Sequence, residues 1–463
     1  MQAPSQGRRA NRRALVVVLT GALLFGAAAP RRAGAVVALQ GVLTASAGVT
    51  DNVDSAPTEP TPGFPSRRTD LILTVSPGLV LTLGGSRAVQ NISYFYNGQF
   101  YARTSSSNTY TNNVAYNGFF IPSKRTTFAL GLVVSQGQQS TFNGAVDSAT
   151  PVVQVQPARI INILNIAANQ AFGIELTQRW RLQQTLGFST AYFIGNSAQA
   201  ATQAVPGRLI IEYAFPHDVV GLGITTTYTN FLEQRGPVIV PGGAVDGDGI
   251  VTPRQEQVAV TPVFRWRRDL TYFLNARAEL GAVVIFDPND TSRKLTEPAG
   301  GAGLNLFSRL VSLDIAYAHG ADPNLILRSN FLTDLATLRG TFLLGEKSGF
   351  SLSLGLGYAY SRQLDPANAN AIIARAQTVT GDITITYRAL EYLSFFLRYQ
   401  LTDQIANTND PIPLTSYYRN TLLFGLAAIY PPRIPAAVPK KPFGLRADGR
   451  DAPGISSSKS TAP

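Results

Sequence analysis

The feature that most constrains this chain is a long series of segments in which polar and apolar residues alternate. Between residues 36 and 430 about eighteen such segments follow one another, separated by turn residues. Many of them run for ten residues or more, whereas strands in soluble proteins average about five or six. We expect their connections to alternate strictly between short and long, which is the arrangement of a transmembrane β-barrel.

The alternation is clear in the segment from Thr271 to Val284. Apolar side chains, mostly leucine and alanine, occupy one face of it, whereas Asn275, Arg277 and Glu279 occupy the other. The sequence therefore predicts an all-β fold, a closed antiparallel transmembrane β-barrel of about 18 strands, with about 16–18 as the range. The predicted strands cover residues 36–49, 69–84, 87–102, 109–120, 125–136, 159–175, 181–195, 207–215, 219–232, 255–267, 270–286, 297–307, 310–319, 331–345, 348–361, 376–388, 391–403 and 416–430.

Residues 1–35 have the three parts of a secretory signal peptide. A basic stretch with four arginines is followed by the apolar run from Ala14 to Ala29 and by the small-residue cleavage sequence Ala33-Gly34-Ala35. An uncleaved anchor helix is the alternative, although the apolar run is short for a membrane span. The mature chain is expected to start near Val36.

Residues 36–432 are predicted to form the outer-membrane barrel. Residues 433–463 are rich in proline, serine, alanine and lysine, so we expect a disordered tail. An even number of strands places both ends of the barrel on one side, here the short-turn side, which is taken as periplasmic. After the leader no stretch approaches the roughly 18 uninterrupted apolar residues of a membrane helix, which argues against a helical membrane protein.

Composition excludes several classes of function. The chain has no cysteine, so it has neither a disulfide framework nor a thiol active site. Its net charge of +11 is concentrated at the ends, because the leader and the tail each carry six Lys or Arg and only two Asp between them. The barrel region has 27 basic and 26 acidic residues, so it is almost neutral, and a nucleic-acid partner has no support.

The polar faces of the predicted strands suggest a water-filled lumen. Charged residues that fall at mid-strand on these faces are predicted to line it: Arg277, Glu279, Arg339, Asp382 and Arg398. An arginine facing lipid near the bilayer midplane would cost about 2–4 kcal/mol, so the lumen is the favourable place for such residues. Leu280, Ile385 and Leu397 are expected to face lipid. A polar conduit with weak ion selectivity and a network of ion pairs that merely fills the barrel both remain open.

Two local patterns point to a family. Thr50-Asp51-Asn52-Val53 closes the first strand, and Asp70 with Val75-Ser76-Pro77-Gly78-Leu79 follows after a polar loop. This opening resembles the β-barrel porins of the outer membrane, including those associated with exopolysaccharide and exosortase systems. The resemblance implies a porin-like barrel in contact with outer-membrane lipid and lipopolysaccharide, with small polar solutes or polysaccharide as cargo. The chain departs from the usual pattern at its end, where a tail of about thirty residues follows the closing strand.

The remaining chemistry-bearing residues give weak signals. His217 lies in a predicted tight turn and His319 at the start of a loop, and no hydrolase, zinc or phosphate-binding motif accompanies either. Asp246 and Asp248 alternate with glycine in a long loop and resemble part of a calcium loop, but the distal glutamate of an EF-hand is missing. A flexible turn is the simpler interpretation, and no cofactor is expected.

The leading hypothesis is a porin-like channel for small polar solutes, with export of a surface polysaccharide as a narrower version. A non-conducting structural or interaction barrel is the alternative, and an outer-membrane enzyme is a weaker one. The long connection from Gly137 to Pro157 is the segment expected to fold inward if any loop narrows the channel. Oligomeric state cannot be inferred from the sequence.

Overall fold

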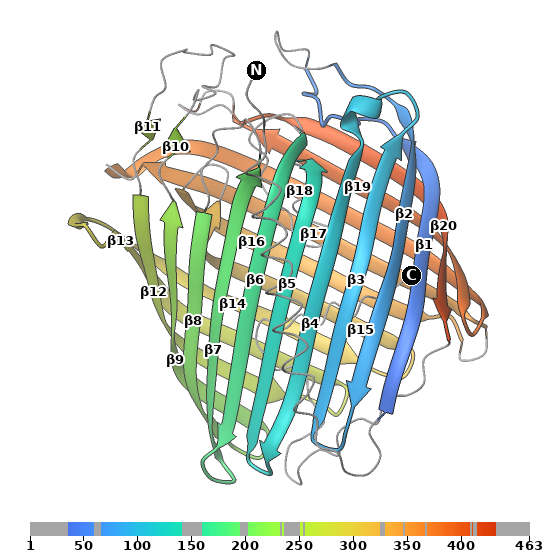
Figure 1. The fold of residues 1–463 in the computed structure, drawn as a ribbon. Coiled ribbons are helices and arrows are strands. Elements are labelled where there is room, and N and C mark those ends of the chain that lie inside the picture. Colours follow the sequence, from blue (N-terminus) through green and yellow to red (C-terminus); the bar gives the residue numbers. More distant parts are fainter. Residues whose placement is uncertain are drawn as a thin grey trace, which may run out of the picture.

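A computed structural model of the chain shows a closed barrel of β-strands (Figure 1). It describes residues 36–59, 66–140, 160–194, 202–231, 234–235, 251–252, 255–324, 329–345, 348–365, 368–407, 410 and 414–431. Eighteen strands form one sheet in which every pairing is antiparallel, and a separate two-stranded pairing joins β10 (Gln234–Arg235) to β11 (Val251–Thr252). The predicted fold class and strand number are therefore confirmed.

The strands of the barrel are β1 (Val36–Thr50), β2 (Asp70–Gly84), β3 (Ala88–Tyr101), β4 (Thr109–Ser123), β5 (Thr126–Ser140), β6 (Ile160–Glu175), β7 (Trp180–Ile194), β8 (Thr202–Ala214), β9 (Asp218–Phe231), β12 (Gln255–Asp269), β13 (Leu274–Asp287), β14 (Asp290–Phe307), β15 (Val311–Asn324), β16 (Ser329–Leu343), β17 (Phe350–Asp365), β18 (Asn368–Leu390), β19 (Leu393–Ala406) and β20 (Tyr417–Tyr430). A short 3₁₀ turn, η1 (Ser105–Ser107), lies between β3 and β4. In Figure 1 the blue-to-green strands of the first half of the chain form the wall nearest the viewer, and the yellow-to-red strands form the wall behind it.

One expectation about the connections is wrong. On the long-loop side, β13 joins β14 and β17 joins β18 through only two residues each, because β14 begins at Asp290 and β18 at Asn368. The sequence pattern placed both starts about seven or eight residues later. Strand ends that project beyond the lipid have water on both faces, so they need no polar–apolar alternation and escape detection by that pattern.

The barrel closes between its first and last strands. β1 pairs with both β2 and β20, and its pairing with β20 runs from Gly41 opposite Tyr430 to Thr50 opposite Thr421. Gly48 lies within this closing seam, where a Cβ atom would come within 1.8 Å of the Leu422 carbonyl oxygen. A side chain at position 48 would therefore force the two strands apart.

The pairing register assigns each strand two faces. Leu280, Ile385 and Leu397 lie on one face and are 65, 43 and 44% exposed, and Ile385 and Leu397 are direct cross-strand partners. Arg208 of β8 and Glu279 of β13 lie on the other face and form an ion pair of 2.7 Å, although β9 and β12 separate their strands. Side chains converge in this way only on the concave side of a barrel. The apolar face is therefore the outer one.

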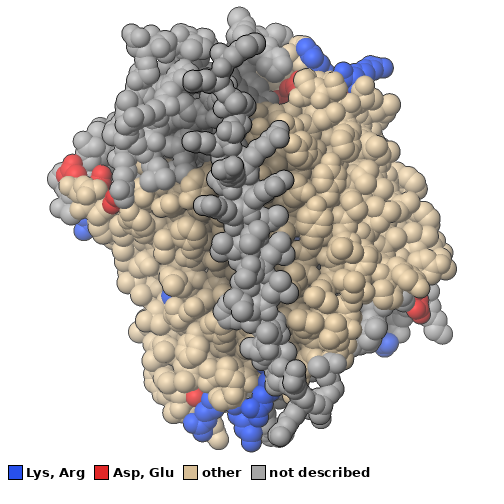
Figure 2. All heavy atoms as spheres, in the orientation of Figure 1, with Lys and Arg blue, Asp and Glu red and all other residues tan. Residues whose placement is uncertain are grey.

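The described outer surface on the face drawn in Figure 2 is almost free of charge between its ends. In the described part of the face shown in Figure 2, charged side chains gather near the two ends of the barrel, and the broad middle is nearly all uncharged. Aromatic residues border this band near the short turns, where Trp180, Tyr213 and Phe215 form a chain of edge-to-face contacts with centroids 5.0 and 4.7 Å apart. Phe350 stacks on Tyr387 in the same region.

Amphipathic rings prefer the membrane–water interface, and only closed barrels and helices satisfy their backbone hydrogen bonds within lipid. A closed barrel with an apolar outer band and aromatic girdle is the architecture of bacterial outer-membrane proteins. The chain is a barrel of the bacterial outer membrane. Within the described residues, no helix has the length and hydropathy needed to cross a membrane. The predicted signal peptide (1–35) and tail (433–463) lie outside the described residues.

The face assignment predicts a pattern of chemical labelling. The chain has no native cysteine, so each single cysteine variant carries one thiol. In proteoliposomes, a membrane-impermeant maleimide is expected to label R277C and R398C and to leave L280C and L397C unmodified, because the second pair lies in lipid. Labelling of the second pair in place of the first would show that the faces are inverted.

Candidate functional site

The inner face of the barrel carries a compact group of four charged residues on β8, β12 and β13. The register places Glu212 opposite Gly221, Gly221 opposite Arg265, and Arg265 opposite Glu279. Glu212, Arg265 and Glu279 therefore occupy one row across adjacent strands, and Arg208 lies beside it on β8. Arg265 lies 3.2 Å from Glu212 through Nη1 and 3.4 Å from Glu279 through Nε. Arg208 donates a 2.7 Å hydrogen bond to Oε1 of Glu279, the same oxygen that Arg265 approaches. The row is held together by charge-assisted hydrogen bonds.

The burial of this group differs from one end to the other. The Glu212 side chain is 3% exposed and also accepts a 3.1 Å hydrogen bond from the Gln183 amide. Glu279 is 32% exposed, so its charge remains accessible from the barrel interior. One end of the row is therefore structural, and the other end is open to solvent or solute.

Two more ion pairs continue the charged surface along the wall. Arg277 lies 3.3 Å from Asp314 of β15, and the register places Arg339 of β16 directly opposite Asp314. Further along, Arg398 of β19 donates a 2.5 Å hydrogen bond to Asp382 of β18. Asp382 also accepts one from Thr384.

The sequence-predicted residues thus fall on one face but in different pairs. The structure brings Asp382 and Arg398 together, whereas Arg277 and Glu279 each bind partners that the sequence did not single out. Those missed partners are Arg208 and Arg265 for Glu279 and Asp314 for Arg277, and Glu212, the partner of Arg265, was missed as well. Alternation with Leu209 and Ile211 is the signal that would have placed Arg208 and Glu212 on the polar face.

Two loop segments cover part of the inner wall at the long-loop end. Val53, in the loop after β1, is 3% exposed and packs against Ile72, Tyr101 and Leu423, which the register places on the inner face. Leu414, in the loop before β20, packs in the same way against inner residues of β16 and β18. A backbone hydrogen bond of 3.0 Å from Thr58 to Ser416 joins the two loops.

These inward loops are not the segment that the sequence suggested. Gly137 to Ser140 belong to β5, and the rest of the Gly137–Pro157 connection lies outside the described residues. The signal for the loop after β1 was the Asp51-Asn52 pair, which we interpreted only as part of a family resemblance. In the structure this pair of residues joins the first loop to the last strand.

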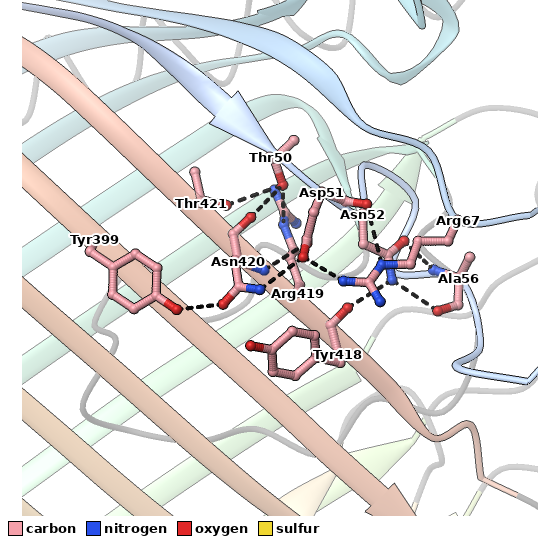
Figure 3. A network of polar contacts seen from close by, with 10 residues as sticks. All are labelled: Thr50, Asp51, Asn52, Ala56, Arg67, Tyr399, Tyr418, Arg419, Asn420 and Thr421. Atoms are coloured by element: carbon pink, nitrogen blue, oxygen red, sulfur yellow. Dashed lines mark hydrogen bonds and ion pairs between the residues drawn. The ribbon is translucent and has the colours of Figure 1, made fainter.

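Asp51 is the centre of a polar clasp between the first loop and the last strand (Figure 3). Its carboxylate accepts hydrogen bonds of 2.8 Å from both the backbone N–H and the side-chain amide of Asn420, and a further one from Arg67. Tyr399 donates a 2.6 Å hydrogen bond to the same Asn420 side chain. The Arg67 guanidinium also lies over the ring of Tyr418, 5.4 Å from its centroid.

Asn52 fixes the shape of the loop that follows. Its side-chain amide donates to the carbonyls of Ala56, at 2.9 Å, and Tyr418, at 3.0 Å, and its oxygen accepts the Ala56 N–H at 2.8 Å. Ser55 within this turn has a φ of 49°, in the left-handed region. Asn52 therefore holds the loop in a compact form against β20, with Ala56 fully buried.

The electrostatic balance of the clasp is expressed in the pKa of Asp51. Partial burial raises that pKa, but the hydrogen bonds from Asn420 and the hydrogen bond and charge of Arg67 together outweigh burial and hold the pKa below its ordinary value. The carboxylate is thus ionised throughout the physiological range.

The histidines lie away from the charged inner surface. His319 Nδ1 is 2.8 Å from Asp334, which also accepts a 2.6 Å hydrogen bond from Tyr317, and the register places all three on the outer face near the long-loop end. His217 lies in the short turn between β8 and β9, where its carbonyl accepts the Asp269 N–H. In the described part of the chain, His319 thus pairs with a carboxylate and His217 makes a backbone contact, and neither arrangement is that of an activated nucleophile.

The structure gives no test of the calcium hypothesis. Asp246 and Asp248 lie outside the described residues. Within the described ranges, no three His, Asp or Glu side chains are grouped closely enough to hold a metal ion.

Comparisons with known proteins return structural likenesses only. No protein-family model and no curated protein matches the chain. The FrpB iron transporter from Neisseria meningitidis is 10% identical with a TM-score of 0.42, over 85% of this chain and 81% of that one. The anion-selective porin from Comamonas acidovorans is 10% identical with a TM-score of 0.33, over 86% of this chain and all of that one. OmpT of Vibrio cholerae is 10% identical with a TM-score of 0.31, over 87% and 100%.

The clasp predicts a measurable loss of stability in D51A. Removing hydrogen bonds to a charged group that is 27% exposed should lower the free energy of unfolding by roughly 1–3 kcal/mol. The urea midpoint of the barrel in detergent micelles, followed by tryptophan fluorescence, measures this. D54A is the matched control, because Asp54 lies in the same loop but accepts only from Ser107 among the contacts described. Equal midpoints for D51A and D54A would contradict the role given to the clasp.

The lowered pKa of Asp51 determines how the stability contributed by the clasp depends on pH. A carboxylate with a depressed pKa contributes stability that is present above its unfolded pKa, about 3.9, and is lost as the pH falls through the lower folded value. The difference in stability between wild type and D51N should therefore be constant from pH 5 to 8 and shrink below about pH 4. A difference that changed between pH 5 and 8 would point to another titrating group.

Proposed function

We propose that this barrel is an open aqueous channel for small polar solutes across the outer membrane. The observation that carries the proposal is the combination of eighteen strands with a polar, ion-paired inner face. Barrels of about eight strands are filled by their own side chains, whereas those of about 16–18 leave an aqueous passage. A solvent-filled interior also accounts for charged side chains that remain about one-third exposed, such as Glu279.

Weak ion selectivity follows from the way the inner charges are paired. In the described part of the chain, arginines and acidic residues are interspersed on the inner face of β8 to β19: Arg208, Arg265, Arg277, Arg339 and Arg398 with Glu212, Glu279, Glu297, Asp314 and Asp382. Opposite charges on neighbouring strands cancel much of each other's field at a distance. A passing ion would therefore meet local charges but little net potential.

The inward loops support a passage that is narrower at the long-loop end than at the short-turn end. Val53 covers inner-wall residues of β2, β3 and β20, Leu414 covers those of β16 and β18, and the Thr58–Ser416 hydrogen bond ties their loops together. Such an entrance would limit solute size. Export of a surface polysaccharide, which the family resemblance implies, is a narrower version of the same proposal.

Reconstitution in a planar bilayer tests the channel. The purified mature barrel is expected to give stepwise increases in ionic current, with similar permeability for small cations and anions. A variant lacking residues 141–159 is the second arm, because this connection is the one that the sequence analysis expects to fold inward if any loop narrows the channel. Absence of current from both proteins would overturn the channel and leave a structural or interaction barrel.

Charge neutralisation within the row gives a sharper test. In E279Q the two arginines that bind Glu279 lose a compensating charge, so the preference for anions over cations should rise about twofold. Reversal potentials under a salt gradient measure the ratio. E391Q, at an exposed short turn, is the matched control and should behave like wild type. An unchanged ratio in E279Q would mean that ions do not pass this part of the wall.

A further inference from the structure

The inner wall is divided into a charged part and an uncharged part. On β1 to β7, the inward-facing positions carry charge only at the strand ends, with Asp70 at the long-loop end and Glu175 and Arg181 at the short turns. The two turn residues pair with each other at 3.8 Å. Arg181 lies opposite Glu212 in the register, and Glu212 and the other inner charges described above lie on β8 to β19. In Figure 1, β1 to β7 lie in the wall nearest the viewer, and β8, β9 and β12 continue that wall at its left side.

The uncharged wall is built mainly from side-chain amides and hydroxyls. The register places Thr82, Asn91, Asn117 and Asn169 in one row across β2, β3, β4 and β6, with Gly131 of β5 between the last two. We call these four residues the amide row. A second row, two inward positions further along the strands, contains Phe95, Asn113, Ser135 and Asn165. Thr82 donates to Asn91 at 2.8 Å, and Asn117 is exposed.

An aromatic ring lies flat against this wall. Gly78 and Phe95 are cross-strand partners, and a Cβ at position 78 would come within 2.3 and 2.5 Å of two atoms of the Phe95 ring. The ring therefore covers Gly78, which a larger residue would prevent. Phe119, on the same face of β4, is 40% exposed. The uncharged wall thus offers aromatic surface beside the amide row.

These groups together define the chemistry of a ligand. Each amide is both a hydrogen-bond donor and an acceptor, as is each hydroxyl of a sugar. The flat face of an aromatic ring packs against the apolar C–H face of a sugar ring, because both rings combine an apolar face with polar groups or a polar edge. A charged solute finds no counter-charge at mid-strand on this wall, and a purely apolar one would leave the amides without partners.

We propose that the inner wall of β1 to β7 is the contact surface for uncharged polyhydroxylated solutes, that is, neutral saccharides. The inference rests on the proposed channel function and specifies the class of solute. Binding would be weak at each position, because each amide only exchanges a hydrogen bond to water for a similar one to the solute. Many such amides follow one another along the wall, so the weak contact is repeated. Weak repeated contacts let a solute enter and also leave.

The concentration at which a solute blocks the ionic current tests the saccharide surface separately from the existence of the channel. The probes are maltohexaose as a neutral saccharide, an oligogalacturonate of the same length as a charged one, and polyethylene glycol of equal hydrodynamic radius. Maltohexaose is expected to interrupt the current at concentrations at least fivefold below those needed for either comparison probe. Equal concentrations for maltohexaose and polyethylene glycol would overturn the proposal while leaving the channel intact.

Variants of the wall locate the contact. The triple variant N91A/N117A/N169A is expected to raise the blocking concentration of maltohexaose at least fivefold and to leave single-channel conductance within about a third of wild type. The matched control is T225A/T227A on β9, which truncates inward-facing residues outside the uncharged wall. A block that is unchanged in the triple variant, or equally weakened in the control, would overturn the assignment to β1 to β7.

The saccharide surface can still be tested if a variant does not fold or if the barrel carries no current. Heat-modifiable mobility on gels shows whether each variant is folded, and N117A alone serves if the triple variant is not. If no protein conducts, the channel is overturned, and the wall is tested by saturation-transfer NMR with maltohexaose on wild type and variant. Equal or absent transfer for both would overturn the saccharide surface as well.

Discussion

The structure depends on one constraint, that a backbone amide within hydrocarbon has no water to bond. Each strand must therefore have a partner on both sides, and a sheet satisfies this only when its first and last strands meet. Here β1 and β20 complete the circle, and Gly48 permits the close approach that their register requires. Strand number, lumen width and the room for charged side chains inside all follow from this closure.

The same constraint explains how much of the fold could be predicted from the sequence. A wall between lipid and water imposes a period of two, so Leu280, Ile385 and Leu397 on one side and Arg277 and Arg398 on the other could be assigned from local pattern alone. The constraint ends where the lipid ends. The early parts of β14 and β18 rise beyond it and were therefore not recognised.

The candidate site was less predictable, because its contacts join distant parts of the chain. Local alternation placed Glu279 on the polar face, but Arg208 and Arg265 reach it only through the register of four strands. The inward folding of Val53 likewise depends on packing against β2, β3 and β20. No short-range pattern encodes either arrangement. The lack of charge on β1 to β7, by contrast, is present in the sequence, but only the assembled barrel shows that these strands form one continuous stretch of the inner wall.

The clasp at Asp51 has a consequence for how the barrel comes to be complete. Asp51 and Asn420 are 369 residues apart, so their contact spans most of the chain. Contacts of this kind form late, because the entropy of closing so large a loop must be overcome before they are gained. The clasp therefore cannot assist the early pairing of hairpins. It forms only after β20 has found β1, and it then opposes their separation, so it acts on the rate at which a finished barrel reopens more than on the rate at which it assembles.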